Sequence, residues 1–166
     1  EYKKIVIVRS AVPTRDIGFL KGSEAEKGAV YEIPYKSICC DLFGRGDAYE
    51  VLSKHGSIQF MLTSFIRGIT LDNCIIIVDE LQNLTAHEAD SVLTRLGKHS
   101  KIIMCGDILQ RDFTKFSEKN IESFMKIIER MDCFDINFFG ENDVVRSGVV
   151  GEYIRKKHKL FPKGFE

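Results

Sequence analysis

The sequence lacks a surplus of charge and any long apolar stretch. Lysine plus arginine and aspartate plus glutamate both number 24, so the overall charge favours neither a polyanionic partner nor a membrane surface. No apolar run approaches the roughly 18 residues that cross a bilayer, and no hydrophobic signal core follows the first lysines. We therefore expect no membrane partner, and any contact with nucleic acid has to come from a local patch.

Paired cysteines are also missing. None of the five cysteines has the CxxC spacing of a zinc site or a redox motif, and Cys74 and Cys105 stand in strongly apolar runs. The histidines share no metal-ligand spacing either. This usage predicts a reducing, cytoplasmic compartment.

The chain does have enough material for one core. With 166 residues and 44% hydrophobic content it can bury one sizeable core but not two, so we expect a single domain over residues 1–166. The chain enters an apolar segment directly after Lys4 and does not begin with methionine. We therefore expect this domain to be truncated at its N-terminus.

Short apolar runs rich in β-branched residues predict the strands. Dense runs of this kind suit parallel strands that are covered on both faces. The three strongest runs are residues 5–8, 74–78 and 102–105, a weaker candidate covers 58–63, and residues 135–139 supply a candidate fifth strand.

Helical patterns alternate with these runs. The clearest begins at Thr85, whose hydroxyl can cap the first turn while Glu88 reaches back, and its apolar face continues to Leu96 before Gly97. Strands that alternate with helices predict an α/β fold, with a mostly parallel sheet flanked by helices.

Three further segments are expected to be helical. A second capping box, Ser23 to Glu26, opens a shorter helix, and residues 121–131 carry another buried helical face. Residues 31–57, which several glycines and Pro34 interrupt, are expected to form a helical insertion.

The strongest local signal is an apolar strand that ends in two acids, Asp79 and Glu80. In an open parallel sheet, ligands bind beyond the carboxyl ends of the strands, which is where these side chains would stand. A carboxylate there can hold Mg²⁺, directly or through water, and its neighbour can orient or deprotonate an attacking water. The pattern is that of a Walker B motif, although a strand that simply meets solvent with two acids has the same sequence.

The next predicted strand repeats this arrangement. It runs into Gly106 and Asp107, and Gln110 follows three residues later. Glycine lets a turn approach a ligand closely, and a glutamine near a terminal phosphate can respond to the presence of that phosphate. Gly-Asp is also an ordinary turn dipeptide, so it indicates a functional site only in combination with Asp79 and Glu80.

Three arginines could meet the charge that spreads over a transferred phosphoryl group, because guanidinium is planar and permanently charged. Arg9 ends the first strand, Arg67 precedes a glycine, and Arg146 lies in the segment DVVRSG. Each could equally be a surface arginine. Arg146 is the best candidate for an arginine finger, within its own subunit or across an interface, and His87 is interpreted as an exposed helix residue.

Four segments in this order resemble the PhoH family of ATPases, and together they span nearly the whole chain. They are VRSAVPTRDIGFLKGSEAEK at 8–27, FIRGITLDNCIIIVDELQN at 65–83, LTRLGKHSKIIMCGDILQRD at 93–112 and DVVRSGVV at 143–150. The resemblance implies a RecA-like P-loop NTPase core related to the first domain of superfamily 1 helicases, with ATP and Mg²⁺ as its cofactors.

The resemblance also implies roles for named residues. Asp79 and Glu80 would form the Walker B pair, with Asp79 holding Mg²⁺ through water, while Gln110 would sense phosphate and Arg146 would be the arginine of a late motif. Glu80, Gln110 and Arg146 are thus the expected catalytic residues. The expected nucleotide contacts are Asp79, Arg9, Arg67, Gly106, Asp107 and Gln82.

The chain departs from the family pattern in three places. Leu81 stands where the family usually has alanine, and Lys21 where it usually has proline, and neither change touches the two acids or Gln82. No G-x-x-x-x-G-K-[ST] motif occurs in the 166 residues, so the Walker A loop with its phosphate-binding lysine is absent from them. We expect these residues alone to bind ATP poorly, and the missing loop to precede Glu1.

Three hypotheses for the function follow. The main one is an ATPase that couples Mg-ATP hydrolysis to action on RNA or single-stranded DNA, with a homo-oligomer as one way to place Arg146 at a neighbouring site. The second is a non-hydrolysing binding module that retains the RecA-like fold. The third takes Asp79, Glu80 and Asp107 as a two-metal nuclease site, which ATP-independent cleavage of RNA would favour.

Overall fold

The computed structural model describes residues 1–11, 24–107, 118–140, 143–145 and 148–161. The chain divides into two compact units, Glu1–Gly106 and Asp107–Glu166, and each is described by itself. The expectation of one domain over residues 1–166 stays a prediction.

The first unit is built on a parallel sheet of four strands. These are β1 (Lys4–Arg9), β2 (Ile58–Leu62), β3 (Cys74–Val78) and β4 (Lys101–Met104), in the order β2-β1-β3-β4, and every neighbouring pair is parallel. The four strands predicted within residues 1–106 are thereby confirmed, as is the α/β class with a mostly parallel sheet.

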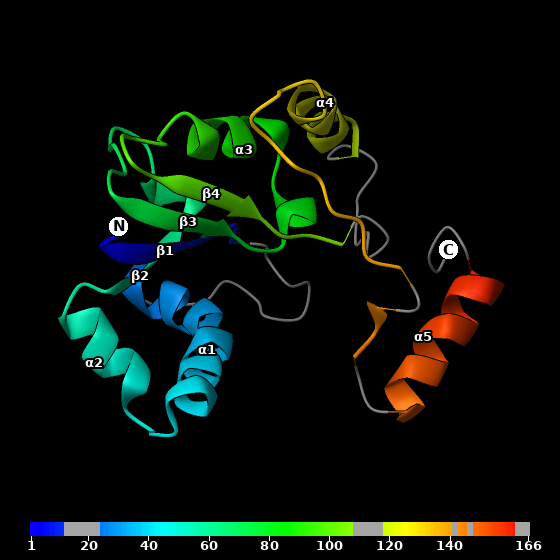
Figure 1. Cartoon of the computed structure of the whole chain (residues 1–166), viewed down its shortest axis with the longest axis horizontal. Coiled ribbons are helices and arrows are strands. Elements are labelled where there is room, and N and C mark those ends of the chain that lie inside the picture. The colour runs from blue at the N-terminus through cyan, green and yellow to red at the C-terminus, as the bar shows by residue number, and fades with distance from the viewer. Residues whose placement is uncertain (12–23, 108–117, 141–142, 146–147, 162–166) are drawn as a thin grey trace. The chain divides into compact units, whose positions relative to one another are not determined.

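Helices cover both faces of this sheet (Figure 1). Helices α1 (Glu24–Phe43) and α2 (Ala48–Lys54) lie on one face, and α3 (Ala86–Leu93) lies on the other. Two single 3-10 turns, η1 (Thr63–Phe65) and η2 (Leu81–Asn83), follow β2 and β3.

The predicted helical insertion is confirmed, although α1 is much longer than the short helix that the sequence indicates. It contains Pro34 and continues to Phe43. The capping box expected at its start cannot be placed, because Ser23 and the side chain of Glu26 lie outside the described residues.

Strand alternation divides the core into two layers, because successive side chains of a strand point to opposite faces. Val6 and Val8 of β1 pair in register with Ile76 and Val78 of β3, and all four are fully buried on the face that α3 covers. Burial is less complete on the sheet face that α1 covers, since Ile5 at the margin of that face is 37% exposed. The prediction that the strands are covered on both faces is therefore met most completely by β1 and β3 on the α3 face, whereas Met61 of β2 and Met104 of β4 on that face are half-buried.

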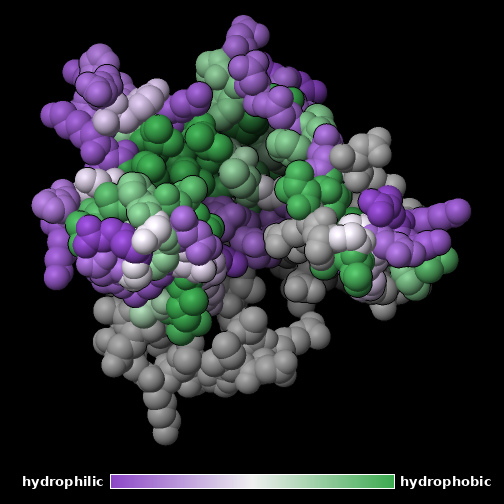
Figure 2. Space-filling view, turned by 60° about the horizontal axis from the view of Figure 1, so that its bottom comes forward, coloured by the Kyte–Doolittle hydropathy of each residue, from purple (hydrophilic) through white to green (hydrophobic). Residues whose placement is uncertain are grey.

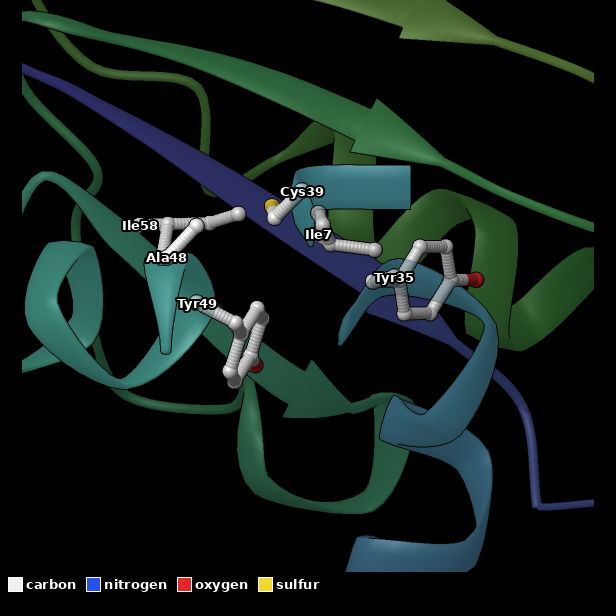
Figure 3. Close-up of a cluster of buried hydrophobic side chains, with 6 residues drawn as sticks. All are labelled: Ile7, Tyr35, Cys39, Ala48, Tyr49 and Ile58. Carbon is white, nitrogen blue, oxygen red and sulfur yellow. The ribbon is translucent and has the colours of Figure 1, made fainter. Parts of the chain in front are cut away.

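A second hydrophobic cluster joins the sheet to α1 and α2 (Figure 3). Its residues are Ile7 of β1 and Ile58 of β2, Tyr35 and Cys39 of α1, and Ala48 and Tyr49 of α2. The ring of Tyr35 also lies against Phe60, with 5.7 Å between the ring centres, while its hydroxyl points away from the cluster. This packing holds α1 against the sheet. It leaves the hydroxyl of Tyr35 to form a contact outside the cluster.

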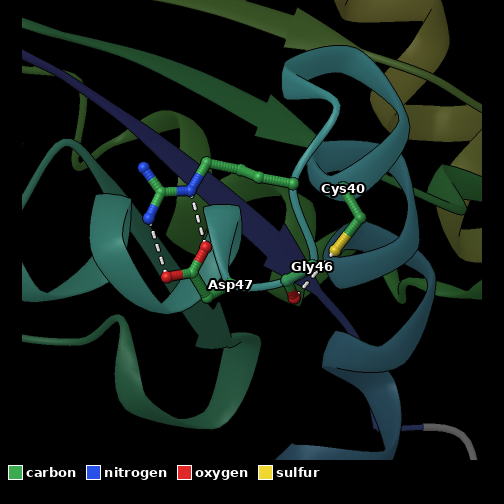
Figure 4. A network of polar contacts seen from close by, with 4 residues as sticks. Cys40, Gly46 and Asp47 are labelled. Carbon is green, nitrogen blue, oxygen red and sulfur yellow. Dashed lines mark hydrogen bonds and ion pairs between the residues drawn. The ribbon is translucent and has the colours of Figure 1, made fainter.

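Polar contacts fix the turn between α1 and α2 (Figure 4). The thiol of Cys40 donates to the carbonyl of Gly46 at 3.2 Å, and the guanidinium of Arg45 donates to both carboxylate oxygens of Asp47 at 2.6 and 2.7 Å. All five cysteines of the chain are free.

The helix predicted from Thr85 ends earlier than the apolar pattern indicates. It stops at Leu93, and Leu96 forms a bridge with Leu71 instead of continuing the buried helical face. The backbone explains the difference, because the N–H of Leu71 donates to the carbonyl of Arg95 at 2.9 Å and the N–H of Gly97 donates to the carbonyl of Leu71 at 3.0 Å. These bonds require an extended segment where a helix would turn.

The predicted fifth strand at residues 135–139 is wrong. The segment has no regular structure, and Phe138 and Phe139 are 80% and 87% exposed. A strand needs backbone hydrogen bonds to a neighbouring strand, and no such bond joins residues 135–139 to the described part of the chain. Apolar residues alone do not supply that partner.

The second unit contains α4 (Glu118–Ile128) and α5 (Gly148–Leu160). Within residues 121–128 of α4, Phe124 and Ile128 are buried, which confirms the helical face predicted there as far as Ile128. No helix in the described ranges is long and apolar enough to cross a membrane.

Apolar side chains also reach the surface, as the green areas among purple ones in Figure 2 show. On α1 the exposed apolar side chains include Ile33, Leu42 and Phe43.

Replacing Ile76 by alanine is expected to lower the free energy of unfolding by about 2–5 kcal/mol, because it leaves a cavity at a fully buried position of a central strand. Urea unfolding followed by circular dichroism measures the change. The matched control, Ile33→Ala on α1, removes the same atoms from a side chain that is 60% exposed and should change stability by only about 0.5 kcal/mol. Equal losses in the two variants would contradict the placement of β3 in the core.

Candidate functional site

The carboxyl ends of β1 and β3 lie at the same level of the sheet. Val8 pairs with Val78, and the N–H of Asp79 donates to the carbonyl of Val8 at 2.9 Å. Since Val8 and Val78 face α3, the next residue on each strand, Arg9 and Asp79, faces α1. The structure therefore brings two of the predicted site residues to one edge and one face of the sheet.

The Asp79 carboxylate is held by a residue that the sequence did not single out. The hydroxyl of Tyr35 on α1 donates to Oδ2 of Asp79 at 2.5 Å. Burial, and then the hydrogen bond to the Asp79 carboxylate, raise the pKa of Tyr35 above its ordinary value, so the phenol stays protonated and remains a donor. The other carboxylate oxygen, Oδ1, accepts no hydrogen bond from the described residues.

Glu80 leaves the strand through an unusual backbone conformation. Its φ of 53° and ψ of 48° are left-handed, a region that residues other than glycine seldom adopt. The turn is fixed on either side, because Asp79 bonds to β1 and the N–H of Leu81 donates to the carbonyl of Cys105 at 2.8 Å. The conformation interrupts the alternation of side chains directly after β3.

Two side chains hold the Glu80 carboxylate. Nη2 of Arg9 lies 3.7 Å from Oε1, and Nε2 of Gln82 donates to Oε2 at 2.5 Å. Arg9 in turn lies over the ring of Tyr31 on α1, with 5.9 Å from its guanidinium carbon to the ring centre. Arg9, Glu80 and Gln82 thus form one network with Tyr31 of α1, and Tyr35 of the same helix holds Asp79.

Gly106 lets the end of β4 approach this network. A Cβ at position 106 would lie 2.9 Å from Oε1 of Gln82 and 3.0 Å from Cβ of Leu81, both of which are too close. Gln82 is itself buried, so its side chain has little room to move aside. Gly106 thus packs closely against Gln82 and Leu81, and its predicted approach to a ligand stays a prediction.

The places of three other predicted site residues stay predictions. Gln110 and Arg146 lie outside the described residues, and Asp107 is the first residue of the second unit. Within the described part of the chain, no group of three or more His, Cys, Asp or Glu side chains is arranged to hold a metal ion.

The opposite face of the same sheet edge carries a second polar network, centred on Glu88. Ser10 and Thr63 each follow the last residue of a strand, and both donate to Oε1 of Glu88, at 3.0 and 2.6 Å. The predicted capping box is confirmed, since the N–H of Thr85 donates to Oε2 of Glu88 at 2.9 Å and the N–H of Glu88 donates to the Thr85 hydroxyl at 3.2 Å. The sequence predicted the cap but not its links to β1 and β2.

Glu88 is held in its charged form. Burial alone would raise its pKa, but the hydrogen bonds from Thr63, the Thr85 backbone and Ser10 outweigh burial and lower the pKa below the ordinary value of 4.5. The carboxylate is therefore ionised at neutral pH and fastens α3 to the ends of two strands.

Arg67 lies beside this second network. Its guanidinium donates to Nε2 of His87 on α3 at 2.9 Å. A cavity of about 300 Å³ lies here, lined by Thr63, Ser64, Arg67, Glu88 and Ser91. His87 is exposed, as the sequence predicts, and Arg67 contacts it instead of the acids at the end of β3.

Comparison with known proteins gives a consistent result. A family model described as PhoH-like protein matches residues 1–157. The PhoH-like protein of Bacillus subtilis (strain 168) is 34% identical over 158 residues, which are 95% of this chain and 49% of that protein. Protein PhoH2 of the same organism is 38% identical over 133 residues (78% and 30%), and Protein PhoH of Escherichia coli (strain K12) is 31% identical over 148 residues (88% and 42%). The chain spans about half the length, or less, of these relatives.

Replacing Glu88 by glutamine should alter the pH dependence of stability. Because the folded protein lowers the pKa of Glu88, the ionised carboxylate stabilises the fold fully above pH 4.5, and this contribution is lost as the pH falls from there through the lower folded-state pKa. The difference in unfolding free energy between wild type and Glu88→Gln should therefore be largest near neutral pH and shrink below pH 4.5. Urea unfolding at a series of pH values measures it, and a difference that stays constant through acid would contradict this account.

Proposed function

Because the chain belongs to the PhoH-like protein family, we propose that it carries the hydrolytic residues of an ATPase that acts on RNA or single-stranded DNA. The family is in general one of P-loop ATPases, and the parallel sheet flanked by helices is consistent with a RecA-like core. One observation carries the proposal. It is the pair Asp79 and Glu80 at the carboxyl edge of the sheet, each held by its own hydrogen-bond donor.

The Asp79 carboxylate fits the way in which proteins bind Mg²⁺. This ion keeps several of its waters and takes only one or two carboxylates besides the phosphates of its substrate. Oδ2 of Asp79 is oriented by Tyr35, and Oδ1 is left for the ion or for one of its waters. When bound, Mg²⁺ would neutralise charge on the phosphate oxygens of ATP.

Glu80 is placed to accept a proton from the attacking water. Arg9 and Gln82 hold its carboxylate from two sides, and a positioned carboxylate of this kind is a suitable general base. The permanent charge of Arg9 also stands at this edge, where it can attract phosphate. Gln110 as phosphate sensor, Arg146 as arginine finger, and Asp107 as a further contact complete the proposed site on sequence grounds.

The Walker A loop is not among these 166 residues, so the proposal concerns the protein as its complete gene encodes it. A gene without that loop would favour the non-hydrolysing binding module. The nuclease hypothesis joins Asp79 and Glu80 to Asp107 of the second unit, and it stays a prediction. The five free cysteines support the proposed cytoplasmic location.

The Glu80→Gln variant should hydrolyse ATP about 10²–10⁴ times more slowly than wild type, because it loses the proton acceptor while keeping the size of the side chain. Phosphate release in the presence of Mg²⁺ measures the rate, and a fluorescent ATP analogue measures binding, which should persist. Glu50→Gln, an exposed acid on α2, is the control and should retain the wild-type rate. Full activity in Glu80→Gln would reject the assignment.

The Tyr35→Phe variant should need more Mg²⁺. It removes the hydrogen bond to Asp79 but keeps the ring in the hydrophobic cluster, and loss of such a supporting bond lowers metal affinity about 10-fold or more. The concentration of Mg²⁺ that gives half-maximal ATP hydrolysis measures the effect. Tyr49→Phe is the matched control, since Tyr49 belongs to the same cluster and has no contact with Asp79, and it should leave that concentration unchanged.

A further inference from the structure

The cavity beside α3 is lined by hydrogen-bond donors that the fold does not use. Arg67 donates to His87, but a guanidinium has five N–H donors, and this arginine forms no ion pair with any described residue. The hydroxyls of Ser64 and Ser91 have no hydrogen-bond partner among the described residues. A positive charge and two free hydroxyls around one hollow favour an anion.

Glu88 also lines this cavity, and it is ionised. Its Oε1 accepts from Ser10 and Thr63, and its Oε2 accepts from the backbone N–H and the hydroxyl of Thr85, so four hydrogen bonds hold the carboxylate in the wall of the cavity. These donors are neutral and the charge of Glu88 remains, but Glu88 forms no ion pair with Arg67. The guanidinium of Arg67 therefore keeps donors for a phosphate.

The cavity is distinct from the proposed nucleotide site. Arg9 and Asp79 face α1, whereas Ser10 and Thr63, one position beyond the ends of their strands, face α3 and contact Glu88. The two sites thus lie on opposite faces of the same sheet edge. A ligand in the cavity would occupy a place that the Asp79 and Glu80 network does not.

We propose that this cavity binds a backbone phosphate of a single nucleic-acid strand, with Arg67 as its principal contact and Ser64 and Ser91 as hydroxyl donors. The inference rests on the proposed action on RNA or single-stranded DNA and names where the strand is held. A cavity of about 300 Å³ has room for one nucleotide unit. Contacts to phosphate position a strand without reading its bases, so binding here is independent of sequence.

The test is binding of fluorescently labelled oligouridine and oligodeoxythymidine to the purified full-length protein, measured by anisotropy. The Arg67→Gln variant should bind both strands about 10-fold more weakly. The slope of log affinity against log salt concentration should become smaller by about 0.7, as expected for one lost phosphate contact on a single strand. Arg67→Lys, which keeps the charge but not the planar fork, should fall between wild type and Arg67→Gln.

Arg45→Gln is the matched control. It removes the same charge from the same unit, but Arg45 is already paired with Asp47, so strand affinity should stay at the wild-type value. ATP binding and competition by inorganic phosphate at constant ionic strength are measured alongside.

Each other outcome overturns the inference in a recognisable way. If wild type binds the strands and Arg67→Gln binds them equally well, the cavity is not the strand site, and the proposed function stands. If Arg67→Gln loses ATP binding and keeps strand binding, Arg67 belongs to the nucleotide site that the sequence suggests. If inorganic phosphate binds in an Arg67-dependent manner and neither strand does, the cavity holds a free anion only. If wild type binds neither strand, the nucleic-acid half of the proposed function falls together with the inference.

Discussion

The register of β1 between β2 and β3 is the constraint on which the rest of the structure depends. Val8 pairs with Met61 on one side and with Val78 on the other, so the three strands end at one level. A slip of one residue would exchange every inward and outward side chain of β1. In the observed register, Arg9 pairs with Glu80 after the end of β3, and Ser10 donates to Glu88 on the opposite face of the sheet.

The two faces of the sheet differ in how they use this arrangement. On the α3 face the central residues of β1 and β3 are fully buried, and hydrogen bonds from Ser10, Thr63 and Thr85 to Glu88 fasten α3 to the sheet edge beside the cavity. On the α1 face burial is less complete, and the carboxylates of Asp79 and Glu80 keep partial access to solvent. Groups that bind and release a ligand need that access, whereas groups that fasten a helix do not.

The sequence predicts those parts of the fold that depend on neighbouring residues. The four strands of the sheet, the capping box at Thr85 and the position of Asp79 and Glu80 at a strand end all follow from local patterns. Tyr35 could not be found in this way, because it reaches Asp79 from 44 positions away and lies in a helix whose pattern Pro34 interrupts. The hydrogen bonds of Ser10 and Thr63 to Glu88 could not be predicted either, because they depend on how β1 and β2 are aligned in the sheet. The strand predicted at 135–139 was wrong because an apolar segment does not reveal whether a neighbouring strand exists.

The left-handed backbone of Glu80 has a consequence for the evolution of the chain. A residue with a Cβ in this conformation costs about 1–2 kcal/mol relative to one that adopts it freely. Glycine at this position would relieve the strain and make the protein more robust to heat, but it would remove the carboxylate. Selection for thermal stability alone would therefore drive this position away from glutamate, and the role proposed for Glu80 in hydrolysis gives a reason to keep it at a cost in stability.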